Sequence, residues 1–262
     1  MKQKKKSPIK TRQLREPGQW LREQLQDMLE DKVIAYMVPV TLVILLAMLE
    51  WLRMFFNATP SLTTSVILSI SAIIASCWYA CYVYKNWHQY RNMQLGMEGE
   101  LSVGQYLEET LAAHNYHILH DIQCNGFNID HVVIGLTGIF CVETKAISKP
   151  VNKDARVRFD GEKVTIDGFT PDRDPIKQVK SSAYWLHDCI KSFTGKSFFV
   201  HPIVVFPGWF VEKMSPNVEV WVLNEKVVPT FIQNAGNKIS PDDVSLIFSC
   251  LKQYALSAPS GI

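Results

Sequence analysis

Residues 128–146 read NIDHVVIGLTGIFCVETKA, and this stretch decides the fold. It holds two runs of strand-forming residues, Asn128 to Gly135 and Gly138 to Ala146, separated only by Leu136 and Thr137. β-Branched and aromatic residues favour strands, and a two-residue connection joins antiparallel neighbours. The stretch therefore predicts a tight β-hairpin that carries apolar residues on both of its faces.

Within this hairpin, two acidic side chains are predicted to face each other. A two-residue loop pairs Gly135 with Gly138, and counting back along both strands places Asp130 opposite Glu143. Side chains directly opposite each other have Cβ atoms about 5 Å apart. Lys145 lies two residues beyond Glu143, so strand alternation puts it on the same face. Two nearly buried carboxylates at this distance must share a proton, meet cations or bind a metal.

The geometry alone leaves two interpretations of these acids open. One is a site for Mg²⁺ or Mn²⁺, because hard oxygen ligands on a scaffold with open positions suit these ions. The other is a surface ion pair at the end of a sheet, in which Lys145 neutralises Glu143. The neighbouring His131 alternates to the opposite face from Asp130, which predicts packing or a hydrogen bond for it rather than metal ligation.

The elements on either side of the hairpin predict a mixed α/β domain. A helix from Gly96 to about Asn115 comes first, because leucines recur there near the helical period. The remaining predicted elements are a strand from Tyr116 to Gln123 with a turn at Asn125-Gly126, a small hairpin around Asp160-Gly161, a helix from Arg173 or Asp174 to about Phe193, strands at Phe198–Phe206 and Val218–Leu223, and a helix from Pro241 to about Tyr254.

Two uncharged apolar runs precede this domain, Val33 to Leu49 and Leu62 to Tyr84. A membrane span needs roughly 20 apolar residues. The second run meets this length, whereas the first is at the short end and contains Pro39. A cleaved signal peptide and a buried core hairpin are the alternatives, but the region before Val33 is long and contains acids, and a second run follows. We therefore predict a two-span transmembrane hairpin.

The charges flanking these runs predict the orientation. The first 32 residues carry nine Lys and Arg, whereas the connector from Glu50 to Ser61 carries only Arg53. Positive charge stays inside, so both termini are expected in the cytosol and the hairpin in the inner (plasma) membrane. The predicted division is a basic segment 1–32, which attracts anionic lipid or touches nucleic acid, a hairpin 33–84, a linker 85–95 and a soluble domain 96–262.

Composition restricts the soluble domain further. Residues 85–262 hold 17 Lys and Arg against 19 Asp and Glu, which argues against tight, non-specific binding of duplex DNA by charge alone. The chain has six cysteines and no C-x-x-C pair, so no zinc ribbon is expected and the compartment is predicted to be reducing.

From Gly96 to Phe206 the chain resembles the nuclease-related domain (NERD), a branch of the PD-(D/E)XK nuclease superfamily. The resemblance rests on G-x-x-G-E at 96–100, Ile-Asp-His at 129–131, Phe-Cys-Val-Glu-Thr-Lys at 140–145 and Pro-x-x-Gln at 175–178. It implies an α-β-β-β-α-β core, in agreement with the order of the predicted elements. The sequence departs from the family after Lys145, where Ala146 follows instead of a polar residue and then glycine.

The resemblance also implies roles for five residues. Asp130 and Glu143 would hold one or two divalent metal ions, Mg²⁺ or Mn²⁺, against the scissile phosphate. Lys145 would orient the attacking water or stabilise developing charge, and Glu100 would contact the metal directly or through water. Gln178 would position the site or the substrate backbone. Simpler alternatives stay open for two of them: Glu100 as a helix-start acid that complements the helix dipole, and Gln178 as an exposed helix residue.

Residues 145–180 carry nine positive and six negative side chains, an excess that could line a substrate groove or belong to a solvated hairpin. The residues predicted to contact substrate are Lys149, Lys153, Arg156, Arg158, Lys177 and Lys180. The implied function is a membrane-anchored, metal-dependent nuclease that cleaves DNA, with RNA left open. The alternatives are a catalytically silent module that recruits nucleic acid or protein to the membrane, and a membrane assembly protein. A homo-oligomer or another protein partner is also left open.

Overall fold

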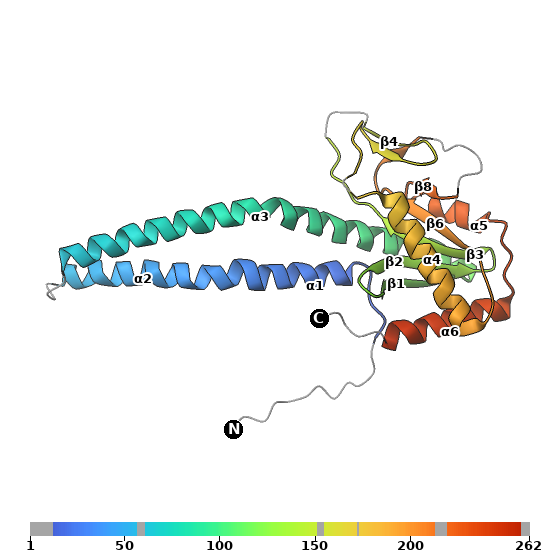
Figure 1. The fold of residues 1–262 in the computed structure, drawn as a ribbon, viewed down its shortest axis with the longest axis horizontal. Coiled ribbons are helices and arrows are strands. Elements are labelled where there is room, and N and C mark those ends of the chain that lie inside the picture. Colours follow the sequence, from blue (N-terminus) through green and yellow to red (C-terminus); the bar gives the residue numbers. More distant parts are fainter. Residues whose placement is uncertain (1–12, 57–60, 151–154, 172, 213–218, 258–262) are drawn as a thin grey trace, which may run out of the picture. The chain divides into compact units, whose positions relative to one another are not determined.

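The computed structural model describes residues 13–56, 61–150, 155–171, 173–212 and 219–257. These residues fall into two units (Figure 1). One is residues 21–94, and the other combines residues 13–20 with residues 95–257.

The unit of residues 21–94 is helical. Three elements follow one another directly: α1 (Gln19–Met28), a π-helical turn (Leu29–Ile34) and α2 (Ala35–Phe55). The next helix, α3 (Leu62–Leu111), starts at the first residue of the second apolar run. Both apolar stretches are long and apolar enough to cross a membrane, and their most apolar windows are 6% and 0% buried. They therefore expose apolar side chains along their length, unlike the core helices of a soluble protein.

Two hydrogen bonds tie the apolar helices to each other within this unit. The Tyr79 hydroxyl donates to the Val33 carbonyl oxygen at 3.2 Å, and the Trp51 indole N–H donates to the Ser69 hydroxyl at 2.9 Å. Because these contacts lie near opposite ends of the two runs, the helices pair along their length as the predicted hairpin.

The helix expected to begin at Gly96 begins instead at Leu62, which corrects that boundary. Residues 85–95, set apart as a linker from the sequence, are helical in the structure. The physical reason is that residues 62–95 contain neither glycine nor proline, so nothing ends the helix after the apolar run.

The other unit is built on a five-stranded sheet. Its strands, in the order in which they pair, are β1 (His117–Gln123), β2 (Asn128–Gly135), β3 (Gly138–Thr144), β6 (Val200–Val205) and β8 (Trp221–Leu223). The first three are antiparallel, and β6 and β8 continue in parallel from β3. Gly135 pairs with Gly138 and His131 with Val142, so the register predicted from the two-residue connection is confirmed.

Helices cover both faces of this sheet (Figure 1). α4 (Pro175–Thr194) and α6 (Pro241–Ser257) pack on one face, over a core that includes Val132 and Cys141. The C-terminal part of α3 and the short α5 (Val228–Gln233) pack on the other, over a core that includes Val133 and Phe140. The mixed α/β fold and its α-β-β-β-α-β order are confirmed.

A second, three-stranded sheet lies beside the main one and consists of β5 (Val164–Ile166), β4 (Arg156–Phe159) and β7 (Phe210–Val211). The β4–β5 hairpin matches the predicted one. Its turn is held by Asp160, whose carboxylate accepts from the backbone N–H groups of Glu162 and Lys163. β7 and α5 were not expected from the sequence.

Residues 13–20 form a strap on the soluble unit, although they precede the apolar helices in sequence. The Arg15 guanidinium bonds the Asp121 carboxylate at 2.6 Å. Gly104 faces Pro17 so closely that an added Cβ would lie 2.5 Å from the proline ring. Gly18 adopts a φ of +68° beside Met97. Residues 13–20 of the expected basic N-terminal segment therefore belong to the same unit as residues 95–257, whereas residues 21–32 belong to the helical unit.

Candidate functional site

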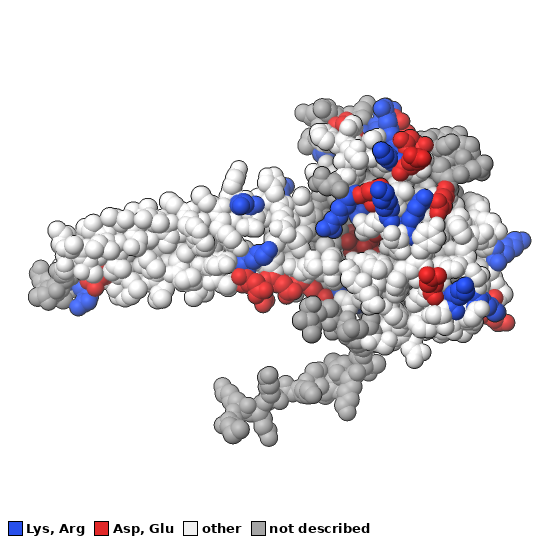
Figure 2. Space-filling view, in the orientation of Figure 1, with Lys and Arg blue, Asp and Glu red and all other residues white. Residues whose placement is uncertain are grey.

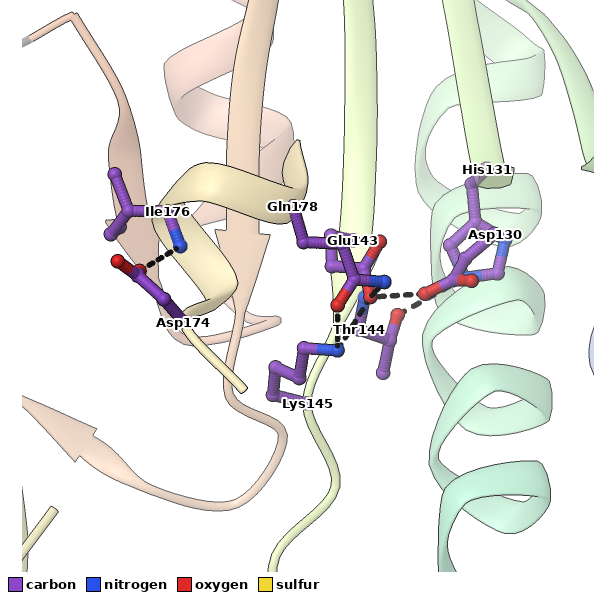
Figure 3. A network of polar contacts seen from close by, with 8 residues as sticks. All are labelled: Asp130, His131, Glu143, Thr144, Lys145, Asp174, Ile176 and Gln178. Carbon is purple, nitrogen blue, oxygen red and sulfur yellow. Dashed lines mark hydrogen bonds and ion pairs between the residues drawn. The ribbon is translucent and has the colours of Figure 1, made fainter. Parts of the chain in front are cut away.

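Asp130 on β2 and Glu143 on β3 lie at the end of the antiparallel pairing, on the sheet face that α4 covers. The ladder ends at His131 and Val142. At the next position the Thr144 backbone N–H donates to Asp130 Oδ2 at 2.7 Å (Figure 3). Both acidic residues are buried, with 5% and 3% of their surface exposed. The hairpin therefore holds two carboxylates side by side within the protein.

Lys145 and Gln178 surround Glu143 in a closed triangle (Figure 3). The Lys145 ammonium donates to Glu143 Oε1 at 2.6 Å and to Gln178 Oε1 at 2.9 Å, and the Gln178 amide donates to the same Glu143 oxygen at 2.6 Å. Gln178 stands in the first turn of α4, which the Asp174 carboxylate caps by accepting from Ile176 N–H. The cap thus fixes the helix turn that delivers Gln178.

Glu100 reaches the site from α3. The residue is 6% exposed, and its Oε2 atom has no hydrogen-bond partner among the described residues. Burial, and then the negative charges of Asp121 and Glu143, raise the pKa of Glu100 to about 8, and the nearby Lys145 opposes this shift. The alternative interpretation of Glu100 as a helix-start acid does not fit the structure, because Glu100 is buried and lies far from the start of α3 at Leu62.

Gly99 allows α3 to approach the end of β3 closely. A Cβ built on Gly99 would overlap the Ala146 side chain, which directly follows the Glu143-Thr144-Lys145 segment. Only glycine permits this approach. The helix that carries Glu100 therefore touches the exit of the strand that carries Glu143.

The electrostatics of the three acids point to a shortage of positive charge. Burial, followed by the charges of Glu143 and Glu100, raises the pKa of Asp130 well above its usual value, and the Thr144 N–H lowers it only in part. Burial also raises the pKa of Glu143, although Lys145 opposes the shift. One lysine cannot neutralise three carboxylates, so this group, which we call the acid group, favours a bound proton or a cation.

The acid group suits a hard divalent cation. Carboxylate oxygens are the ligands that Mg²⁺ and Mn²⁺ prefer. Glu100 Oε2, which has no hydrogen-bond partner among the described residues, is available as such a ligand. In the described part of the chain, no three His, Cys, Asp or Glu side chains are already gathered as a metal cage.

The described members of the predicted substrate-binding set each contact an acidic or aromatic residue outside the acid group. Arg156 and Arg158 both pair with Glu212, at 3.5 and 3.0 Å, and Lys180 pairs with Glu219 at 2.7 Å. Positive and negative side chains alternate on the visible face of this unit (Figure 2). The others are Lys177, which lies 3.9 Å from Asp174, Lys149, which lies over the Trp209 ring, and Lys153, which is outside the described residues.

Sequence reasoning missed the polar contacts on the other face of the hairpin. The prediction that His131 packs or hydrogen-bonds there is confirmed, since it contacts His120 at 2.9 Å and Thr144 at 3.2 Å. The contact between the Thr144 hydroxyl and His131 was not predicted. The only available signal was alternation, which turns the Thr144 side chain away from Glu143 and Lys145 and toward His131.

With this geometry in place, the comparison with protein families is informative. Residues 95–207 match the model of the nuclease-related domain. The chain carries a nuclease-related domain. The matched region contains every residue of the acid group together with Lys145 and Gln178. Neither a curated protein nor a solved structure matches the chain significantly.

The family match ends at residue 207, just after β6. β8, α5 and α6 therefore extend the nuclease-related domain beyond the matched segment. β8 adds a fifth strand beside β6, and α6 contributes Val244, Ile247 and Leu251 to the core under α4. The strap of residues 13–20 extends the domain from the other end of the sequence.

Proposed function

We propose that this protein is a membrane-anchored, divalent-metal-dependent nuclease that hydrolyses phosphodiester bonds of DNA on the cytosolic side. The nuclease-related domain provides the function class. The observation that carries the proposal is the acid group, in which Glu100, Asp130 and Glu143 are buried together with one lysine. Buried acids with strongly raised pKa values cost stability and are concentrated at functional sites.

In the proposed reaction, Asp130 and Glu143 would hold Mg²⁺ or Mn²⁺, which polarises the phosphate and lowers the pKa of a bound water. Lys145 would stabilise the negative charge that develops on the phosphate oxygens. Gln178 accepts a hydrogen bond from Lys145 at 2.9 Å and so keeps the ammonium directed into the site. Glu100, from the other side, would bind the metal or its water through its partnerless oxygen.

The surface cations remain candidates for holding the DNA backbone. Exposed ion pairs contribute only about 0–1 kcal/mol, so exchanging an acidic partner for a phosphate costs little. Arg158, with 69% of its side chain exposed, and Lys177, with 86%, are accessible enough to make that exchange. The other four, Lys149, Lys153, Arg156 and Lys180, are proposed in the same role.

The strap supports the membrane topology. Residues 15–20 precede the two apolar helices, residues 95–257 follow them, and both contribute to the same folded unit. Both therefore lie on one side of a membrane that the helices cross, which requires two crossings. The positive charge before the first helix favours the cytosolic side of the inner membrane.

A catalytically silent module at the membrane is the second candidate. The observation in its favour is the Lys145–Glu143–Gln178 triangle, which is complete without a metal ion. In this reading, the lysine neutralises Glu143 permanently and the domain binds nucleic acid or protein without cleaving it.

The test uses the full chain in detergent, because a fragment that starts after the second apolar run would lack the strap. Plasmid and single-stranded DNA are incubated with Mg²⁺, Mn²⁺ or EDTA. Asp130→Asn and Lys145→Ala are compared with two matched surface variants, Asp242→Asn and Lys191→Ala. We expect metal-dependent cleavage that only the first two substitutions abolish.

Three other outcomes are informative. Equal cleavage by all four variants would place the activity elsewhere or in a contaminant. Mn²⁺ binding at the acid group without cleavage would favour the silent module. Cleavage of RNA but not of DNA under the same conditions would change the assigned substrate and leave the site intact.

A further inference from the structure

A chain of hydrogen bonds runs from α3 across β1 and β2 to Thr144 at the end of β3. Glu108 Oε1 lies 3.0 Å from His120 Nε2, and His120 Nδ1 lies 2.9 Å from His131 Nδ1. His131 Nε2 in turn lies 3.2 Å from the Thr144 hydroxyl. Both histidines are buried, whereas 57% of the Glu108 side chain is exposed. We call these four residues the relay.

Because Glu108 can only accept from His120, it determines which atom donates and which accepts in each hydrogen bond of the relay. The Glu108 carboxylate accepts the hydrogen bond, so His120 carries its proton on Nε2. The two Nδ1 atoms face each other and share one proton. Burial lowers the pKa of the His120 imidazole, so this ring is neutral and its single proton stays on Nε2. His120 Nδ1 then accepts from His131 Nδ1–H, and His131 Nε2 accepts from the Thr144 hydroxyl.

The relay ends at Thr144, the residue whose backbone N–H contacts Asp130. Thr144 stands between Glu143 and Lys145, and its backbone N–H donates to Asp130 Oδ2 at 2.7 Å. The Thr144 side chain points to the other face, where His131 holds it. Thr144 is therefore held by its backbone N–H at Asp130 and by its hydroxyl at His131, so a rotation of the amide away from Asp130 would strain the bond to His131.

We propose that His131, supported by His120 and Glu108, is a positioning residue that holds Thr144 so that its amide fixes Asp130 in a metal-binding orientation. This inference rests on the proposed metal-dependent function and adds to it a set of residues that touch neither metal nor DNA. Partners of metal ligands typically contribute about 10–100-fold to metal affinity or activity.

The decisive comparison is between two substitutions at Thr144 in the full chain. Thr144→Val keeps the shape of the side chain but removes the hydroxyl, whereas Thr144→Ser keeps the hydroxyl. For Thr144→Val we expect a loss of about 10–100-fold in Mn²⁺ affinity and in kcat. Its KM for DNA should not change, because the relay does not face the substrate. Thr144→Ser should stay close to the parent.

A surface pair of variants tests the far end of the relay without disturbing the core. Glu108→Leu removes the acceptor of His120, and Glu109→Leu makes the same change at the next, exposed position of α3. We expect Glu108→Leu to weaken Mn²⁺ binding less than Thr144→Val does, and Glu109→Leu to leave it unchanged. Independently, ¹⁵N spectra of the parent's imidazoles should show the Nδ1–H tautomer for His131 and the Nε2–H tautomer for His120.

Parent-like Mn²⁺ binding and kcat in Thr144→Val would overturn the relay while leaving the proposed function standing. The opposite tautomers, or a Glu108→Leu variant indistinguishable from Glu109→Leu, would also count against it. If Thr144→Val fails to fold, the Glu108 pair and the spectra decide. A parent protein that neither binds Mn²⁺ nor cleaves DNA would overturn the proposed function, and this inference with it.

Discussion

Two buried acids of neighbouring strands, Asp121 and Asp130, have opposite surroundings. Asp121 is fully buried and accepts hydrogen bonds from the Arg15 guanidinium, the Trp20 backbone N–H and the Asn128 amide, at 2.6–2.9 Å. Asp130 accepts from one backbone N–H and lies among other acids.

The comparison indicates that the number of hydrogen-bond donors around a buried acid, rather than its burial, distinguishes a structural acid from a functional one. A buried charge with a full set of donors stabilises a particular arrangement of the chain, here the strap of residues 13–20 on the nuclease-related domain. A buried group of acids with too few donors remains ready to take up a cation. Substitutions at the two acids should therefore have opposite effects on stability and activity.

The largest effect is expected from Asp130→Asn. Losing a metal ligand removes several kcal/mol of transition-state stabilisation, which corresponds to a loss of about 10³-fold in cleavage rate. The free energy of unfolding should stay equal or rise without metal, because the neutral amide relieves repulsion from Glu143. Initial rates and urea unfolding of the same preparation measure both. A variant that cleaves like the parent would show that Asp130 is not a ligand.

The next effect is expected from Asp121→Ala. The substitution leaves the Arg15 guanidinium, whose side chain is only 13% exposed, without its carboxylate. Breaking such a pair costs about 3–5 kcal/mol of unfolding free energy. Urea unfolding monitored by tryptophan fluorescence measures the loss, with the exposed Asp242→Ala as a matched control. A parent-like stability would mean that the strap does not hold the domain together.

A smaller effect is expected from Gly104→Ala, which pushes a methyl group against Pro17. Overpacking of this kind costs about 1–3 kcal/mol. Adding Pro17→Gly removes the opposing ring, so the double variant should recover part of the loss, as measured by a shift in Tm. If the two changes simply add, Gly104 and Pro17 are not in contact.

The last effect concerns pH. The pKa of Glu100 is raised from 4.5 to about 8, so the folded protein binds a proton that the unfolded chain releases. The contribution of Glu100 to the stability of the metal-free protein is therefore full below pH 4.5 and is lost as the pH rises through about 8. Glu100→Gln should flatten this fall. Added Mg²⁺ should raise Tm more at pH 8 than at pH 6, and an equal rise at both would argue against metal binding by Glu100.

Local patterns were enough to predict the hairpin and its acids. The two-residue connection determines which residues of β2 and β3 pair, and strand alternation then places Asp130, Glu143 and Lys145 on one face. Pro175 and the capping Asp174 marked the start of α4, so Gln178 could be placed in its first turn. These features depend on neighbours in sequence, which is why they could be read without a structure.

Features that depend on distant residues could not be predicted. Arg15 and Asp121 are 106 positions apart, and the φ of +49° at Asp121 interrupts the alternation of β1. The pairing of Arg158 with Glu212 is equally remote in sequence, so the charge count of residues 145–180 did not reveal it. The strap and the charge-paired surface therefore emerged only from the three-dimensional arrangement.

The most direct test of the account is Mn²⁺ binding by the DNA-free full chain, measured for the parent, Asp130→Asn and Asp121→Asn. Both variants replace one buried carboxylate by an amide of the same shape, in neighbouring strands. We expect Asp130→Asn to lose Mn²⁺ binding and Asp121→Asn to retain it, at some cost in stability. Retention of Mn²⁺ binding by Asp130→Asn, or equal losses in both variants, would contradict the assignment of the metal to the acid group.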